Sequence, residues 1–221
     1  VVDIPLERML SKRYAADRAD EIVREAATYA ARAGGQDTVY LTAVDGDGNA
    51  VSFINSLYSG FGSGLTTNGF AIHNRGHSFS LDPDHANALA PGKRPFHTII
   101  PSMLLDGGEF RASWGVMGGS MQPQGHLQVV AAMVDSGLNP QAALDAPRFR
   151  WIDGRRVAIE TSRLPEATLA DLRDRGHRLV TDTEFRDRGQ HFGGGQIIYR
   201  TDDGRLIGGS DPRRDGQVVA R

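Results

Sequence analysis

The most informative feature of this sequence is a threonine at the first position of a predicted β-strand, because this position would fix a nucleophilic hydroxyl at the start of the strand. Thr38 follows Asp37 and opens the run Thr38–Val44, which the turn Asp45-Gly-Asp-Gly-Asn49 joins to a second β-branched run at 50–57. Once freed by cleavage, a threonine carries a hydroxyl nucleophile and an α-amine base of pKa roughly 7.7–8.0 on one residue. The run therefore suggests a precursor that cuts itself between Asp37 and Thr38. Threonine also begins strands in many β-rich folds, so an ordinary structural role stays open.

The rest of the pattern predicts hairpins and helices in alternation. Residues 6–32 are charged and alanine-rich with apolar positions near a 3.6 period, so we expect one or two amphipathic helices there. Further hairpins are expected over 99–116, around Asp106-Gly-Gly108, and over 196–209, around Asp202-Asp-Gly204. Helices are expected at 123–136, from Pro140 to before Pro147, and at 165–175. Helix layers over hairpin-built sheets favour a layered α+β fold.

Several short motifs follow in a fixed order, which is more specific than any one of them. They are Thr38-x₆-Asp45-x₂-Gly48-Asn49, Phe61-Gly62-Ser63-Gly64, Lys93-Arg94-Pro95, Gly118-Gly119-Ser120, Ala146-Pro147-Arg148-Phe149 and Ser210-Asp211-Pro212-Arg213. This order resembles the small catalytic subunit of the γ-glutamyltranspeptidase family, among the N-terminal-nucleophile hydrolases. The resemblance runs from about Thr38 to Arg213.

The resemblance implies a domain organisation and a partner. Residues 1–37 resemble the helical C-terminal tail of the family's large subunit, and residues 38–221 the catalytic small subunit. The implied fold is a four-layer αββα sandwich, which periodicity alone would not choose. The implied partner is the large subunit of the same precursor, in a heterodimer or a dimer of heterodimers.

The resemblance also implies catalytic roles for four residues. Thr38 would be the nucleophile, and Ser56 falls where the family keeps a hydroxyl that hydrogen-bonds it. Gly118 and Gly119 match the pair whose backbone N–H groups form the oxyanion hole, which acyl transfer needs. From the residues alone, Ser56 could be an ordinary strand serine and the glycines an ordinary strand-to-helix turn. Gly193-Gly-Gly195 is expected to be a close-packing turn near the site.

The substrate-recognition segment departs from the family pattern. Where typical members carry Asn-Asn-Gln-x-x-Asp, whose Gln and Asp hold the donor's α-ammonium, Asn74 is kept, Arg75 replaces Gln and Ser78 replaces Asp. A guanidinium is a planar fork that suits a carboxylate, so this change favours a carboxylate over an ammonium. Tyr58 stands in place of an asparagine, and His97 and Thr98 in place of two serines. We expect these six residues to bind substrate, and we expect strict γ-glutamyl specificity to be lost.

Composition limits the other classes of function. Net charge is −2 and no apolar run approaches the roughly 20 residues of a membrane span, so neither nucleic acid nor membrane is expected as a partner. The absence of cysteine excludes disulfides and thiolate chemistry. His73 and His77 have a zinc-like i, i+4 spacing but no Glu between them, so we expect no metal and no cofactor. The compartment is undecided, with the cytoplasm slightly favoured over secretion or the periplasm.

The sequence is thus interpreted as a self-cleaving amidohydrolase or acyltransferase that acts through an acyl-threonine on γ-glutamyl or related carboxylate-bearing amides, with water or an amino acid as acceptor. One alternative is an acylase without γ-glutamyl specificity. An alternative from another class is an inactive or unprocessed homologue that serves as a binding or scaffold protein.

Overall fold

The computed structural model describes residues 5–26, 38–181 and 191–220. Asp37, and with it the bond expected to be cut, lies outside the described residues. The helices are α1 (Leu6–Met9), α2 (Lys12–Ala19), α3 (Met121–Val134), α4 (Pro140–Asp145) and α5 (Glu166–Asp174), with 3₁₀ turns η1 (Arg75–Ser78) and η2 (Thr161–Arg163). The strands are β1 (Thr38–Val44), β2 (Ala50–Ser56), β3 (Thr66–Thr67), β4 (Phe70–Ala71), β5 (Ser102–Asp106), β6 (Glu109–Met117), β7 (Phe149–Asp153), β8 (Arg156–Ile159), β9 (Arg178–Thr181), β10 (Gly194–Arg200) and β11 (Leu206–Ser210).

The expected hairpin that begins at Thr38 is confirmed. β1 and β2 pair antiparallel with Thr38 opposite Ser56 and Val44 opposite Ala50. The turn between them closes on the Asp45 carboxylate, which accepts hydrogen bonds from the backbone N–H groups of Asp47 (3.0 Å) and Asn49 (2.8 Å). These bonds, with one from the Asn49 side chain, lower the pKa of Asp45. Local turn chemistry therefore sets the register that brings Thr38 and Ser56 together.

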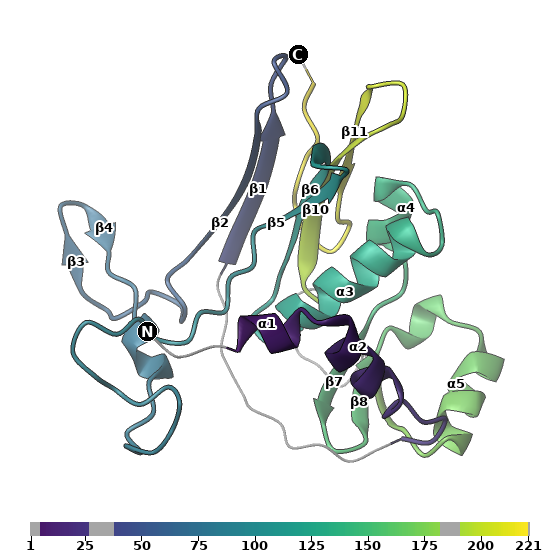
Figure 1. The fold of residues 1–221 in the computed structure, drawn as a ribbon, viewed down its shortest axis with the longest axis horizontal. Coiled ribbons are helices and arrows are strands. Elements are labelled where there is room, and N and C mark those ends of the chain that lie inside the picture. Colours follow the sequence, from purple (N-terminus) through teal and green to yellow (C-terminus); the bar gives the residue numbers. More distant parts are fainter. Residues whose placement is uncertain (1–4, 27–37, 182–190, 221) are drawn as a thin grey trace.

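The centre of the molecule is a four-stranded antiparallel sheet in the order β11-β10-β6-β5. The β1–β2 hairpin packs over one face of this sheet, and α3 and α4 cover the other (Figure 1). The main apolar core lies between the sheet and these two helices, with Trp114 and Ile197 from the strands and Val129 and Leu144 from the helices. The order of layers is helices, sheet, hairpin, which confirms the α+β class.

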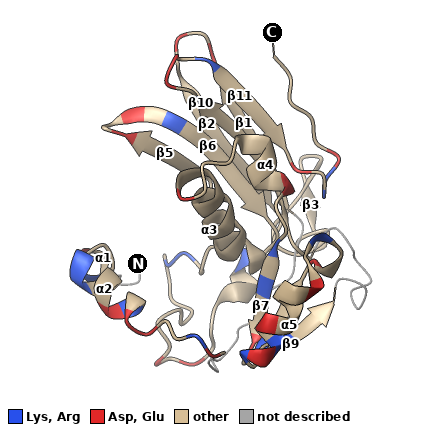
Figure 2. Ribbon diagram, turned by 90° about the vertical axis from the view of Figure 1, so that its right-hand side faces the viewer, with Lys and Arg blue, Asp and Glu red and all other residues tan. Residues whose placement is uncertain are grey.

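One layer of the expected four-layer sandwich is not present among the described residues. Successive side chains of a strand face opposite sides, and the outward side chains of the hairpin include Val39, Leu41, Val51 and Phe53. Val39 is 63% exposed and Val51 50% exposed, and no Lys, Arg, Asp or Glu colours the ribbon of β1 or β2 in Figure 2. No described helix covers this apolar face, nor is any described helix long and apolar enough to cross a membrane.

A second, smaller sheet has the order β7-β8-β9, with β8 and β9 parallel and α5 between them in sequence. The sequence predicted α5 but none of these three strands. Of the one or two helices expected over residues 6–32, the described part shows α1 and α2, which end at Ala19 and bury no residue, while residues 27–32 lie outside the described residues. The two-residue strands Thr66–Thr67 and Phe70–Ala71 pair in a small projecting hairpin.

Candidate active site

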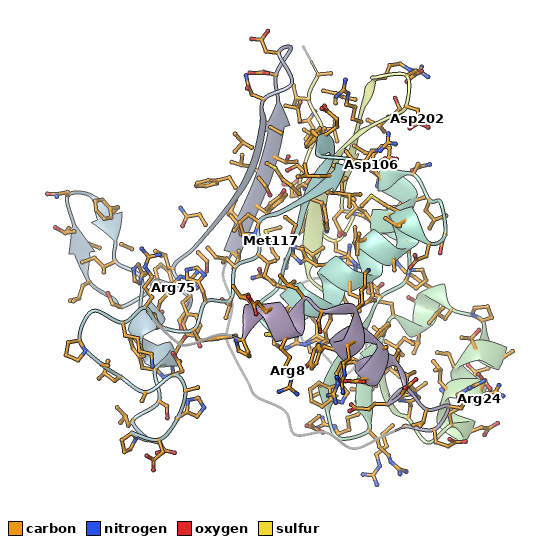
Figure 3. All side chains as sticks on the ribbon, in the orientation of Figure 1. Arg8, Arg24, Arg75, Asp106, Met117 and Asp202 are labelled. Atoms are coloured by element: carbon orange, nitrogen blue, oxygen red, sulfur yellow. The ribbon has the colours of Figure 1, made fainter. Side chains whose placement is uncertain are left out.

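A small apolar cluster joins the segments that carry the predicted site residues. Tyr40, Ile54 and Met117 are buried against one another, and Ile99 packs on them. Tyr40 lies two residues after Thr38, Ile54 two before Ser56, Met117 one before Gly118 and Ile99 one after Thr98. The two ends of the β1–β2 hairpin therefore meet two segments that are distant in sequence, and Figure 3 places Met117 beside the start of β1.

Thr38 and Ser56 are direct cross-strand partners in this region. Because side chains alternate along a strand, both lie on the face that carries Tyr40, toward the four-stranded sheet. Directly opposed residues in an antiparallel pair hold their Cβ atoms about 4.5–5.5 Å apart, within reach of a hydrogen bond between hydroxyls. The Ser56 Oγ also accepts the backbone N–H of Tyr58 at 3.0 Å, and Tyr58 has a positive φ of 78°. The Ser56 hydroxyl is thus held at the point where β2 ends.

Arg75 reaches this pair from η1. Its Nη2 donates to the Ser56 carbonyl at 3.2 Å and its Nη1 to the Thr98 Oγ1 at 3.3 Å. The residue is only 6% exposed, and burial lowers the pKa of its guanidinium. No carboxylate among the described residues forms an ion pair with Arg75; its charged group lies 6.0 Å from the Tyr58 ring centroid. A buried cation with only neutral partners is suited to an anionic ligand.

Other predicted recognition residues line the same loop region. The pKa of His97 is lowered by burial and by the nearby charge of Arg75, which favours a neutral ring. Asn74 accepts the Ser59 N–H at 3.0 Å and donates to the Ser59 hydroxyl at 3.1 Å, so it holds the loop rather than presenting a free amide. The Ser78 hydroxyl is buried without a hydrogen-bond partner in the described part of the chain.

Gly118 and Gly119 form the turn from β6 into α3. Both have positive φ, 133° and 56°, a conformation that side chains other than glycine rarely adopt. Their carbonyls accept the N–H groups of Met121 and Gln122 at 3.0 Å, while neither glycine N–H is donated to any described residue. Two backbone N–H groups without an acceptor in the described part of the chain therefore stand at the positive N-terminal end of a 14-residue helix. This arrangement can stabilise a developing negative charge.

The predicted close-packing turn lies behind these glycines. A Cβ on Gly118 would stand 3.0 Å from the Gly193 Cα, so the two glycines touch backbone to backbone. The Arg148 guanidinium holds this segment by donating to the Phe192 carbonyl at 3.1 Å, and Asp211 accepts the Gly195 N–H at 2.9 Å. Sequence analysis quoted Arg148 and Asp211 only as family motifs and missed this role.

Those two residues belong to a buried network of four charges. The Arg148 Nη2 lies 2.7 Å from the Asp211 carboxylate, and the side chains are 2% and 0% exposed. Arg213 bonds the other Asp211 oxygen at 3.1 Å and also pairs with Glu160. Glu160 in turn accepts the Arg148 N–H at 2.8 Å. The network joins the ends of the two sheets immediately behind the glycine turn.

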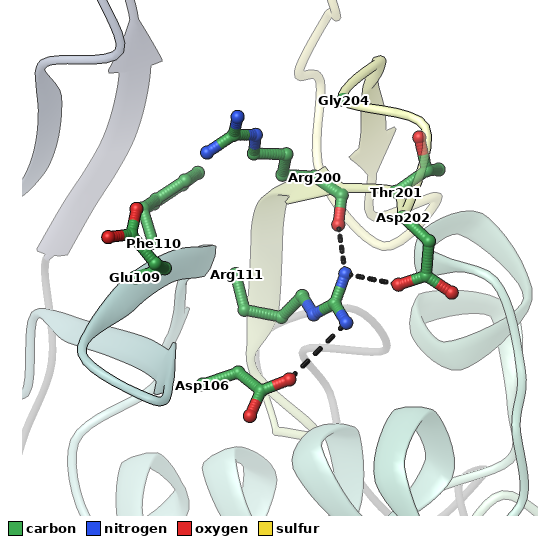
Figure 4. Close-up of a pocket in the computed structure, with 8 residues that line it drawn as sticks. All are labelled: Asp106, Glu109, Phe110, Arg111, Arg200, Thr201, Asp202 and Gly204. Carbon is green, nitrogen blue, oxygen red and sulfur yellow. Dashed lines mark hydrogen bonds and ion pairs between the residues drawn. The ribbon is translucent and has the colours of Figure 1, made fainter.

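A separate pocket of about 230 Å³ lies at the opposite end of β6 (Figure 4). Arg111 spans it, with Nη1 2.7 Å from Asp202 and Nη2 3.4 Å from Asp106. These bonds tie the β5–β6 turn to the β10–β11 turn and leave the cation satisfied, so we assign this pocket a structural role. In the described ranges, no three His, Cys, Asp or Glu residues gather as metal ligands would.

The chain is similar to a known family and to several known proteins. The sequence model of the family described as gamma-glutamyltranspeptidase matches residues 1–221. The chain is 42% identical over 226 residues to a glutathione hydrolase-like YwrD proenzyme of Bacillus subtilis, covering 98% of the chain and 42% of that protein. It is 36% identical to an oxamate amidohydrolase proenzyme of Klebsiella pneumoniae, covering 99% of the chain and 42% of that protein.

The solved structures include a cephalosporin acylase from Bacillus halodurans. The likeness has a TM-score of 0.88 at 50% identity and covers 99% of this chain and 40% of the other. The chain thus spans about two fifths of the length of these relatives.

Proposed function

The chain belongs to the γ-glutamyltranspeptidase family, and from that premise we propose that it is the catalytic part of a self-cleaving N-terminal-nucleophile amidohydrolase. The observation that carries the proposal is the pair of N–H groups on Gly118 and Gly119 that donate to no described residue. They lie at the end of the hairpin where β1 begins with Thr38. A nucleophile and an oxyanion site at one place are the two requirements of acyl transfer.

The proposed reaction begins after cleavage of the Asp37–Thr38 bond. The Thr38 Oγ attacks an amide carbonyl while the Thr38 α-amine takes its proton, and the Gly118 and Gly119 N–H groups hold the oxyanion. The C–N bond then breaks, the α-amine returns the proton to the leaving amine, and an acyl-threonine ester remains. Water, or an amino-acid amine, attacks this ester and releases the acyl group. The Ser56 hydroxyl, opposite Thr38 in the hairpin, orients the nucleophile.

We propose that the acyl group carries a carboxylate that Arg75 binds. The support is a buried guanidinium beside Ser56 whose bonded partners are neutral. Thr98 and His97 flank it, and Ser78 stands where a carboxylate would pair an ammonium. The name of the Klebsiella relative fits this chemistry, since oxamate is an amide whose acyl part carries a carboxylate and no ammonium. The name of the Bacillus subtilis relative keeps a γ-glutamyl substrate as the alternative.

We further propose that residues 38–221 act with a large subunit made from the same precursor. The apolar outward face of the β1–β2 hairpin, around Val39 and Val51, is the surface that this subunit would cover. The relatives named proenzymes extend well beyond the length of this chain, which supports such a partner.

Two assays on the full-length protein test the proposal. Intact-mass analysis should find two fragments split before Thr38 in the wild type and one uncut chain in Thr38→Ala, while Thr38→Ser, which keeps the hydroxyl, should cleave more slowly. A Thr38→Ala protein that is processed normally would contradict the nucleophile. A wild-type chain that stays whole and inactive would instead support a binding or scaffold role.

The second assay compares two p-nitroanilides, glutaryl and γ-glutamyl, which differ only in the α-ammonium. Faster hydrolysis of the glutaryl compound is expected if Arg75 binds a lone carboxylate. A clear preference for the γ-glutamyl compound would return the protein to the ordinary γ-glutamyl class.

A further inference from the structure

Strand β7 is fixed beside α3 by two glutamines of the helix, whose side-chain amides bond backbone groups of β7 as a neighbouring strand would. The Gln128 amide accepts the Phe149 N–H at 3.0 Å and donates to the Phe149 carbonyl at 2.9 Å. One helical turn earlier, Gln124 accepts the Trp151 N–H at 2.7 Å and donates to the Trp151 carbonyl at 3.2 Å. Arg150, between those two strand residues, is thereby held in register with the first turn of α3.

The Arg150 guanidinium connects the two backbone segments that form the glycine turn. Its Nη2 donates to the Ser120 Oγ at 2.7 Å, and Ser120 is the residue directly after Gly119. Its Nη1 donates to the His191 carbonyl at 3.2 Å, two residues before Gly193, which touches Gly118. One planar fork therefore fixes both the turn that presents the free N–H groups and the segment against which that turn rests.

Arg150 differs from Arg148, two residues earlier, in its backbone partner and in having no described counterion. Arg148 donates to the next carbonyl, that of Phe192, and has Asp211 as its counterion. Arg150 forms no ion pair with any described carboxylate, and burial alone lowers its pKa. Together with burial, its charge lowers the pKa of His191 to about 4, so that ring is neutral near pH 7. Within residues 5–26, 38–181 and 191–220, no carboxylate compensates this positive charge beside the glycine turn.

We propose that Arg150 is a positioning residue for amide hydrolysis, which holds the Gly118–Gly119 turn through Ser120 and adds positive potential where the oxyanion forms. The inference rests on the proposed function, because it takes these glycines as the oxyanion site. It predicts that Arg150 acts on the chemical step and leaves substrate binding largely unchanged. Its bonded partners lie in the turn (Ser120) and in the segment behind it (His191), and not in the region of Arg75.

The test uses the full-length, processed protein and glutaryl p-nitroanilide. Arg150→Met should lower kcat and the single-turnover acylation rate about tenfold to a hundredfold, with KM changed less than about twofold, because displacement of a catalytic group by about 1 Å can cost about 10²-fold. Arg150→Lys keeps the charge but not the fork and should recover part of the loss. Arg156→Met is the matched control, since Arg156 is exposed and its one side-chain partner among the described residues is Asp153, at 2.8 Å. This variant should match the wild type.

A double-substitution cycle separates positioning from a general effect on stability. Ser120→Ala removes the acceptor while the rest of the turn stays, so it should reproduce part of the kcat loss with an unchanged melting temperature. If Arg150 acts through Ser120, the double variant Arg150→Met/Ser120→Ala should be no slower than Arg150→Met. Fully multiplicative losses, or Ser120→Ala with wild-type kcat, would overturn the proposal.

Thr38→Ala separates failure of this inference from failure of the proposed function. If Thr38→Ala is inactive while Arg150→Met is folded and keeps wild-type kcat, Arg150 is not a positioning residue and the proposed function stands. If Thr38→Ala hydrolyses the anilide, the proposed function is wrong and the inference falls with it.

Discussion

Gly115 offers a direct test of how the hairpin positions its first residue. Gly115 lies on β6 beneath the ring of Tyr40, and a Cβ there would stand 2.5 Å from the ring atoms Cδ2 and Cε2. Carbon atoms pack best at about 3.5–4.0 Å, so Gly115→Ala requires the ring to move by about 1 Å. The ring cannot swing away freely, because its hydroxyl bonds Ser52 at 2.8 Å and Ser113 at 3.3 Å. We therefore expect β1 itself to shift, two residues from Thr38.

The size of the effect follows from that displacement. Overpacking of a tight core contact costs about 1–3 kcal/mol of unfolding free energy, which leaves most proteins folded. A shift of about 1 Å at a reacting group can slow the reaction about 10²-fold. We therefore expect Gly115→Ala to fold with reduced stability and to cleave before Thr38 on the order of a hundredfold more slowly than the wild type.

The assay is a time course of precursor cleavage followed by intact mass, with thermal unfolding measured in parallel. Gly46→Ala is the matched control, because it lies in the β1–β2 turn with nothing within 4 Å of the added Cβ, and it should cleave at the wild-type rate. Gly115→Ala that cleaves as fast as Gly46→Ala would refute the argument that Tyr40 fixes the position of Thr38.

Three further predictions concern Arg75, Asp211 and His191. Arg75→Gln should raise the apparent KM for glutaryl p-nitroanilide about tenfold or more, since a charge-assisted hydrogen bond is worth about 1.5–3 kcal/mol. The double variant with Ser78→Asp should shift preference toward the γ-glutamyl compound. An unchanged KM in Arg75→Gln would contradict carboxylate binding by Arg75. Asp211→Asn should lower the free energy of unfolding in urea by about 3–5 kcal/mol, because Arg148 keeps a buried charge without its counterion; a loss below about 1 kcal/mol would contradict the network's role. The folded-state pKa of His191 is about 4, against an ordinary value of 6.5, so the unfolded chain binds more protons between these two pH values. The free energy of unfolding should therefore fall as the pH drops from 6.5 to 4. His191→Gln should flatten this pH dependence, and a variant with the same pH profile as the wild type would contradict the role given to His191.

Local chemistry explains what could be predicted from the sequence. The turns at Asp45–Asn49, Asp106–Gly108 and Asp202–Gly204 were each predicted, and each joins two antiparallel strands with ends near those expected. Turn residues and strand alternation are properties of neighbouring residues, so a sequence displays them directly. Over residues 6–26, the helical structure predicted for residues 6–32 ends at Ala19. Neither α1 nor α2 buries a side chain, and helical stability comes mostly from packing of an apolar face.

What could not be predicted depends on contacts between distant segments. The β7-β8-β9 sheet includes a parallel pair separated by α5, and its strands carry arginines that hide the β pattern. The family resemblance supplied Thr38, Ser56 and Arg75, but not that the Arg75 guanidinium bonds the Ser56 carbonyl. Arg148 and Arg150 were missed as parts of the site because their partners include the backbone carbonyls of Phe192 and His191, which no residue type reveals.

The hairpin that carries Thr38 is held to the described fold by one face alone. Tyr40 and Ile54 secure its inner face, while Val39 and Val51 are among four large apolar side chains exposed on its outer face. Complete burial of one such side chain contributes about 1.5–3 kcal/mol. These four already bury part of their surface, so covering the rest would add on the order of 4 kcal/mol, a large share of a typical 5–15 kcal/mol of stability. Whatever covers the outer face therefore also stabilises the position of Thr38 over the glycine turn. Docking of that layer and assembly of the site are then one coupled equilibrium, because a shift of the hairpin moves the nucleophile away from Gly118 and Gly119.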